Sequence, residues 1–114
     1  MTEVEKVNID EQFRKVQVQI YRQFQKNPDL DVLLFLIGVR ELGVVKDKFT
    51  KSEKVDLMHI ATCRLLSEEG YYKLAGQDQE GWPHWEPIKA LPTLTTYEQE
   101  YLLKKQIIRY FEAL

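Results

Sequence analysis

Residues 27–43 read NPDLDVLLFLIGVRELG, and most of the predicted architecture follows from this stretch. Six apolar residues run without interruption from Val32 to Ile37. At about 100° per residue their side chains point nearly all the way round a helix, which is typical of a helix buried on most sides. We therefore predict a central helix at 28–42 that other elements cover.

Periodicity alone would also allow a buried strand. Three signals favour a helix: Asn27 as N-cap, Pro28 at the first helical position and Gly43 just past the end. Gly38, in the middle, costs about 1 kcal/mol relative to alanine. We expect another helix to pass closely over Gly38, with a kink or a gap for a ligand as the alternative.

Capping-box spacing, a Ser, Thr or Asn followed three residues later by Glu, marks three further helices. Asn8 with Glu11 predicts a helix running to about residue 25, with residues 1–7 frayed. Its apolar stripe is Ile9, Phe13, Val16, Ile20 and Phe24. Thr50 predicts a helix over 51–69, and Thr95 predicts a final helix with its own stripe, Leu103, Ile107, Tyr110, Phe111 and Leu114.

The segment 70–94 has a different composition, rich in Gly and Pro and containing both tryptophans. Residues 71–74 and 85–88 could pair as a short β-hairpin around a connection at 76–81. Pro83 and Pro87 cannot donate backbone hydrogen bonds, which limits the pair to an edge ribbon or an irregular loop. The predicted fold is mainly α, with about four helices around the central helix 28–42 and a cap at 70–94.

Length and composition predict a single domain over residues 1–114. Because the formal net charge is −2, we expect no strongly basic face that could bind nucleic acid. The single cysteine excludes an intramolecular disulfide. Neither a secretory signal nor a run of eighteen apolar residues occurs, so we expect a soluble cytoplasmic protein that makes no membrane contact.

His59 and Cys63 stand four residues apart on one face of the predicted helix 51–69, and His84 lies in the cap. These residue types can bind zinc if all three converge. The alternative is a histidine at the edge of the core beside a buried cysteine that acts as a small hydrophobe. No catalytic or phosphate-binding motif occurs, so we predict no catalytic residue and no cofactor. The alternative is a small zinc-binding or enzymatic protein centred on His59, Cys63 and His84, in which His59 would activate the Cys63 thiol.

Aromatic residues in the cap carry the leading functional prediction. Rings with one polar edge are enriched at protein contacts. The candidate binding residues are Tyr71, Tyr72, Trp82, His84 and Trp85. They predict a non-catalytic interaction module that contacts a protein partner or a second copy in a dimer; the alternative is that these rings fill the core.

The helices 28–42 and 51–69, followed by a ribbon at 71–88, also outline a winged-helix DNA-binding regulator. The ribbon and the residue that follows it carry three acidic residues, Asp78, Glu80 and Glu86, and only two basic ones, Lys73 and Lys89. Contact with phosphates requires the opposite sign of charge, so this composition argues against DNA binding.

Three strings, LFLIGVRELG (34–43), DLMHIATCRLL (56–66) and EGWPHWE (80–86), resemble those of a group of small bacterial proteins without an assigned activity. The resemblance covers most of the chain from Ile9 to Phe111. It implies a compact intracellular bacterial protein and supplies no catalytic residue, cofactor or partner.

Overall fold

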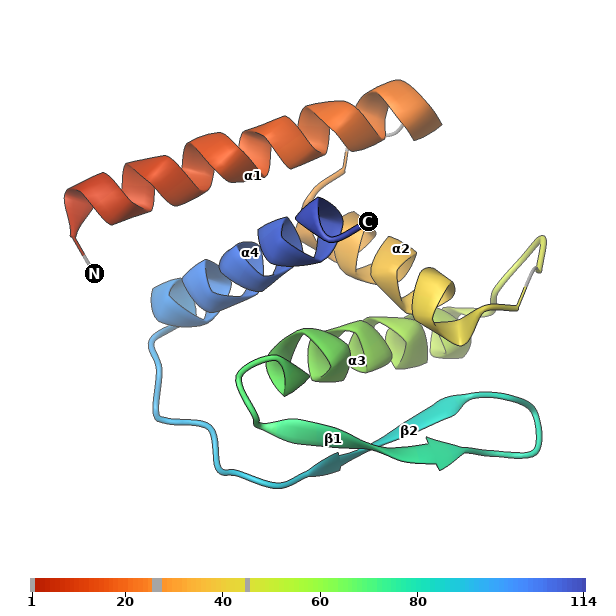
Figure 1. Ribbon diagram of the computed structural model, residues 1–114. Helices are drawn as coiled ribbons and strands as arrows, with labels where there is room; N and C mark the ends of the chain where they lie inside the picture. Colours follow the sequence, from red (N-terminus) through yellow and green to blue (C-terminus); the bar gives the residue numbers. More distant parts are fainter. Residues whose placement is uncertain (1, 26–27, 45) are drawn as a thin grey trace. The chain divides into compact units, whose positions relative to one another are not determined.

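The computed structural model describes residues 2–25, 28–44 and 46–114 (Figure 1). Four helices and one two-stranded antiparallel sheet occur in these residues. They are α1 (Glu3–Phe24), α2 (Leu30–Leu42), α3 (Lys51–Ser67), β1 (Tyr72–Gln77), β2 (Pro83–Pro87) and α4 (Thr96–Glu112). The prediction of a mainly helical chain with a hairpin in the cap is confirmed.

The chain divides into two compact units. One comprises Met1–Leu30 and Pro92–Leu114 and holds α1 and α4, and the other comprises Asp31–Leu91 and holds α2, α3 and the hairpin. The single domain and the central position of the helix 28–42 stay predictions.

Helix α1 begins earlier than the sequence predicted. Thr2 is its N-cap, with the Thr2 hydroxyl accepting a hydrogen bond from the Glu5 N–H at 3.1 Å. Asn8 is therefore an interior residue, and residues 3–7 are helical rather than frayed. Glu3 and Glu5 in the first turn face the positive end of the helix dipole, which stabilises the earlier start.

In the first unit α1 packs against α4. Phe13, Val16 and Ile20 are buried as predicted, whereas Ile9 is only half-buried and the Phe24 side chain lies outside the described part. Polar contacts accompany the apolar ones. Lys104 Nζ lies 5.2 Å from the centre of the Phe13 ring and 3.4 Å from an Asp10 carboxylate oxygen.

Helix α4 starts with the predicted capping box of Thr95 and Glu98, both bonds being 3.1 Å long. Of its predicted stripe, Ile107 and Tyr110 are buried. The other three positions, Leu103, Phe111 and Leu114, are half-buried or exposed.

In the second unit α2 begins at Leu30, so Pro28 precedes the helix instead of starting it, and Asn27 lies outside the described residues. Gly43 follows the last turn at φ +71°, as predicted. The expected close approach over Gly38 is confirmed, because a Cβ there would lie 2.9 Å from the Leu57 Cβ of α3. Glycine at this position lets the two helices pack backbone to backbone.

Helix α3 starts with the predicted capping box of Thr50 and Glu53. Its regular part ends at Ser67, two residues before the predicted end. A Schellman motif follows, in which the Tyr71 N–H donates to the Leu66 carbonyl and the Gly70 N–H to the Ser67 carbonyl. Gly70, at φ +81°, permits this turn and directs the chain into the hairpin.

Strands β1 and β2 pair with Tyr72 opposite Pro87 and Leu74 opposite Trp85. The predicted pairing is confirmed and extends further, to Gln77 opposite Pro83. Both prolines stand at strand ends, where a missing N–H costs least. Both strands contact α3, which lies beside the hairpin in Figure 1.

Candidate functional site

A pocket of about 440 Å³ lies between α3 and the hairpin, wholly within the unit Asp31–Leu91. Its volume is in the range of small-ligand and side-chain pockets, about 300–1,000 Å³. The lining residues are Glu53, Asp56, His59, Ile60, Asp78, Glu80, Trp82, Pro83, His84 and Trp85.

Negative charge dominates this wall. Glu53 and Asp56 come from α3, Asp78 and Glu80 come from the turn of the hairpin, and no lysine or arginine is among the ten lining residues. Glu53 has a counterion outside the wall, because Lys46 Nζ donates to it at 2.6 Å. That contact and the capping bond from Thr50 lower the Glu53 pKa. The remaining carboxylates give the pocket a negative potential, which favours a cation.

Asp78 organises the turn between the strands. Its Oδ1 accepts hydrogen bonds from the backbone N–H groups of Glu80 and Trp82, each at 2.9 Å. Its Oδ2 lies 3.1 Å from His84 Nε2. The His84 bond, followed by the Trp82 bond, lowers the pKa of the Asp78 carboxyl. Sequence reasoning missed this role, although an aspartate three residues before Gly81 is a common turn signal.

Trp82 and Trp85 form the aromatic part of the wall, and both are half-buried. The Trp85 indole N–H is buried and makes no hydrogen bond within the described part of the chain. An unsatisfied buried donor costs about 1–3 kcal/mol. A bound group that carried an acceptor could recover part of that cost.

The predicted binding residues fall into two sets. Trp82, His84 and Trp85 line the pocket. Tyr71 and Tyr72 do not line it, although both are half-buried in the same unit. Lys89 Nζ covers the Tyr71 ring at 4.4 Å and donates to the Glu69 carbonyl at 3.1 Å.

The predicted metal ligands are only partly brought together. His59 Nε2 lies 3.6 Å from Cys63 Sγ, and His59 shares the pocket with His84. Cys63 is fully buried and does not line the pocket. In residues 2–25, 28–44 and 46–114, no group of three His, Cys, Asp or Glu side chains is arranged to hold a metal ion. Zinc binding stays a prediction.

Burial also determines the chemistry of Cys63. It raises the pKa of the thiol to about 11, which leaves very little thiolate at neutral pH. A buried thiol in the middle of a helix, with its backbone N–H groups in helical hydrogen bonds, is poorly suited to act as a nucleophile. This setting agrees with the interpretation of Cys63 as a small core residue.

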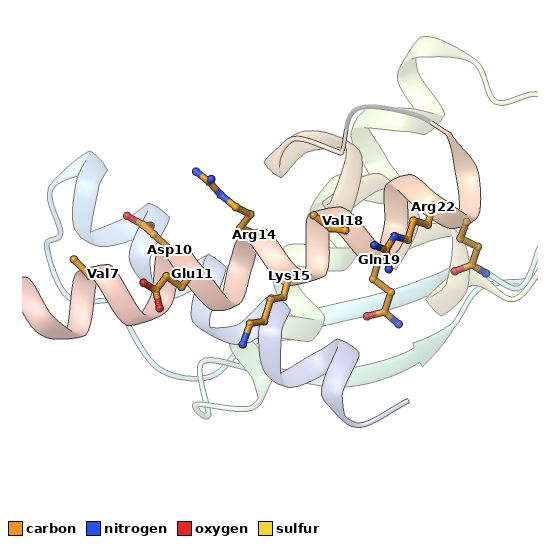
Figure 2. Close-up of a pocket in the computed structure, with 9 residues that line it drawn as sticks. Val7, Asp10, Glu11, Arg14, Lys15, Val18, Gln19 and Arg22 are labelled. Carbon is orange, nitrogen blue, oxygen red and sulfur yellow. The ribbon is translucent and has the colours of Figure 1, made fainter.

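A second concave surface lies along α1 (Figure 2). All its lining residues come from this one helix, and most of them lie on the face away from Phe13, Val16 and Ile20. They are Val7, Asp10, Glu11, Arg14, Lys15, Val18, Gln19, Arg22 and Gln23. A surface with a single helical wall is an open helix face and not an enclosed pocket.

No helix within the described residues is long and apolar enough to cross a membrane. The chain matches no protein-family model, no curated protein and no solved structure.

Proposed function

We propose that the chain is a non-catalytic protein-interaction module, in which the pocket between α3 and the hairpin receives a positively charged side chain of a protein partner. The observation that carries this proposal is the convergence of carboxylates from two elements with two indoles around one pocket. Carboxylates attract a cation, and indole faces bind one through their quadrupole. The two kinds of group together favour arginine or lysine.

A peptide fits this site better than a free amine. The guanidinium of an arginine could contact Asp56 and Glu80 while its plane stacks on an indole. The peptide backbone also supplies carbonyl acceptors, which the buried Trp85 N–H lacks. A protein partner would therefore supply both the charge and the acceptor from one exposed segment.

The same charges argue against the winged-helix alternative. The element order α2, α3, hairpin is compatible with it. However, the face of α3 beside the hairpin presents Glu53 and Asp56, and the hairpin turn adds Asp78 and Glu80. A DNA phosphate would meet carboxylates at the position where a winged helix needs cations.

The test is a titration of the purified chain with a tetra-arginine peptide, followed through the fluorescence of Trp82 and Trp85. A tetra-citrulline peptide, similar in shape but uncharged, is the control ligand. We expect saturable binding of tetra-arginine that weakens with added salt, and no comparable binding of tetra-citrulline. Equal binding of the two peptides would contradict the role assigned to charge.

The double variant Asp56→Asn, Glu80→Gln locates the interaction. Neither side chain takes part in the hydrogen bonds that cap α3 or hold the hairpin turn, so the fold should persist. Each exposed ion pair contributes about 0.2–1 kcal/mol, so removal of two should weaken binding about two- to thirtyfold. The matched control is the double variant Glu100→Gln, Glu112→Gln on α4, which also removes two carboxylates, at exposed positions outside the pocket. Equal losses in both proteins would show that net charge, and not this pocket, attracts the peptide.

A further inference from the structure

The outward face of α1 carries exposed apolar residues in a regular order. Val4, Val7, Val18 and Tyr21 are 44% to 69% exposed and lie opposite the buried side of the helix. With Glu11 and Arg14 they occupy positions 4, 7, 11, 14, 18 and 21, separated alternately by three and four residues. This spacing is that of the a and d positions of a coiled coil.

The stripe is complementary to itself when a second copy runs in the opposite direction. If two α1 helices cross with their centre between residues 12 and 13, Val4 meets Tyr21, Val7 meets Val18, and Glu11 meets Arg14 of the other copy. Each of these layers then occurs twice. Four layers are apolar and the two central ones pair opposite charges.

Charge selects the antiparallel direction. In a parallel pair Glu11 would lie against Glu11 and Arg14 against Arg14, which places like charges in two layers. Four acids, Glu3, Glu5, Asp10 and Glu11, lie in the first half of α1, and three bases, Arg14, Lys15 and Arg22, lie in the second. Lys6 is the exception in the first half, and it covers the Tyr97 ring of α4 at 4.8 Å. An antiparallel pair brings each acidic half beside a basic half.

We propose that the outward face of α1 binds a second copy of this chain, with the two α1 helices antiparallel and Glu11 of each paired with Arg14 of the other. Figure 2 shows the Glu11, Arg14 and Val18 side chains projecting from this helix. This face shares no residue with the pocket that α3 and the hairpin line, so the dimer does not depend on the proposed function. It gives the interaction module two pockets in one assembly.

Sedimentation equilibrium of the full chain over a range of concentrations tests the proposal. The Glu11→Arg variant carries arginine at positions 11 and 14, and the Arg14→Glu variant carries glutamate at both. In each homodimer the two central layers become like-charged, and we expect the association constant to fall about tenfold or more. A mixture of the two variants restores opposite charges in both layers and should associate at least as strongly as the wild type.

The mixture separates pairing from misfolding, because two poorly folded proteins would not regain association when combined. The Gln12→Arg variant is the matched control, since it changes the charge of α1 at an exposed position away from the stripe and should associate like the wild type. Wild-type protein that stays monomeric at its highest soluble concentration would overturn the proposal. So would single variants that dimerise normally, or a mixture that fails to associate.

Discussion

Replacement of Gly38 by alanine tests the packing of α2 on α3. A Cβ at this position would lie 2.6 Å from the Leu57 carbonyl carbon and 2.9 Å from the Leu57 Cβ. Both distances are shorter than atoms tolerate, and the contacted group is mostly backbone, which cannot rotate away. The helices would have to separate or the α2 backbone would have to shift.

The expected size of the effect is a difference of two opposing contributions. Alanine is a better helix former than glycine by about 1 kcal/mol. Overpacking of a close interface costs about 1–3 kcal/mol, and the backbone contact places Gly38→Ala at the upper end. The net result should be a loss of about 2 kcal/mol in the free energy of unfolding.

Urea denaturation followed by tryptophan fluorescence measures this change, because Trp82 and Trp85 lie in the same unit as Gly38. The control is Val55→Ala on α3, at a position that is 62% exposed. That change should leave stability unaltered or raise it by up to about 0.5 kcal/mol. If Gly38→Ala were as stable as the wild type or more stable, helix propensity alone would govern this position and the close approach would be refuted.

Three further outcomes follow from particular contacts. The pKa of the Asp78 carboxyl is lowered, so its ionised form stabilises the hairpin turn above the ordinary aspartate pKa, and this stabilisation is lost as the pH falls through the lowered pKa. The indole NMR signals of the wild type should therefore shift in acid. Those of the Asp78→Asn variant should not. Cys63 should react with a thiol reagent far more slowly in native protein than in urea at pH 7, and equal rates would contradict its burial. Thr50→Ala removes the capping bond to the Glu53 N–H and should cost about 1 kcal/mol in urea denaturation, whereas the exposed Ser52→Ala should cost little.

Local signals predicted the elements whose ends are capped by their own neighbours. Thr50 and Thr95 start helices because each bonds to a residue three positions along. The roles of Gly38, at a close approach of two helices, and Gly43, just past a helix end, could also be predicted from the sequence, since a glycine at such positions has few structural roles. Such signals need no knowledge of distant residues.

The start of α1 shows the limit of local signals. Thr2 with Glu5 and Asn8 with Glu11 have the same capping spacing, so the spacing could not choose between them. The earlier cap is the one used, which adds residues 3–7 to α1. Those added turns bring Val4 and Val7 onto the outward stripe.

The pocket could not be predicted because its residues are far apart in the sequence. Asp56 and Glu80 reach the same wall only after the hairpin packs on α3. The sequence indicated Trp82, His84 and Trp85 as binding candidates but gave no reason to join them to the carboxylates of α3. The local pattern likewise gave no sign of the two compact units.

If the proposed function is right, the pocket between α3 and the hairpin binds a cationic side chain. The chain has two tryptophans, and both line this pocket, so a ¹⁵N-labelled sample should give two indole N–H signals that report on the site directly. On titration with tetra-arginine, both signals should shift progressively with the added peptide, and tetra-citrulline should leave them in place. Shifts confined to backbone signals outside the pocket, with both indole signals unchanged, would contradict the claim.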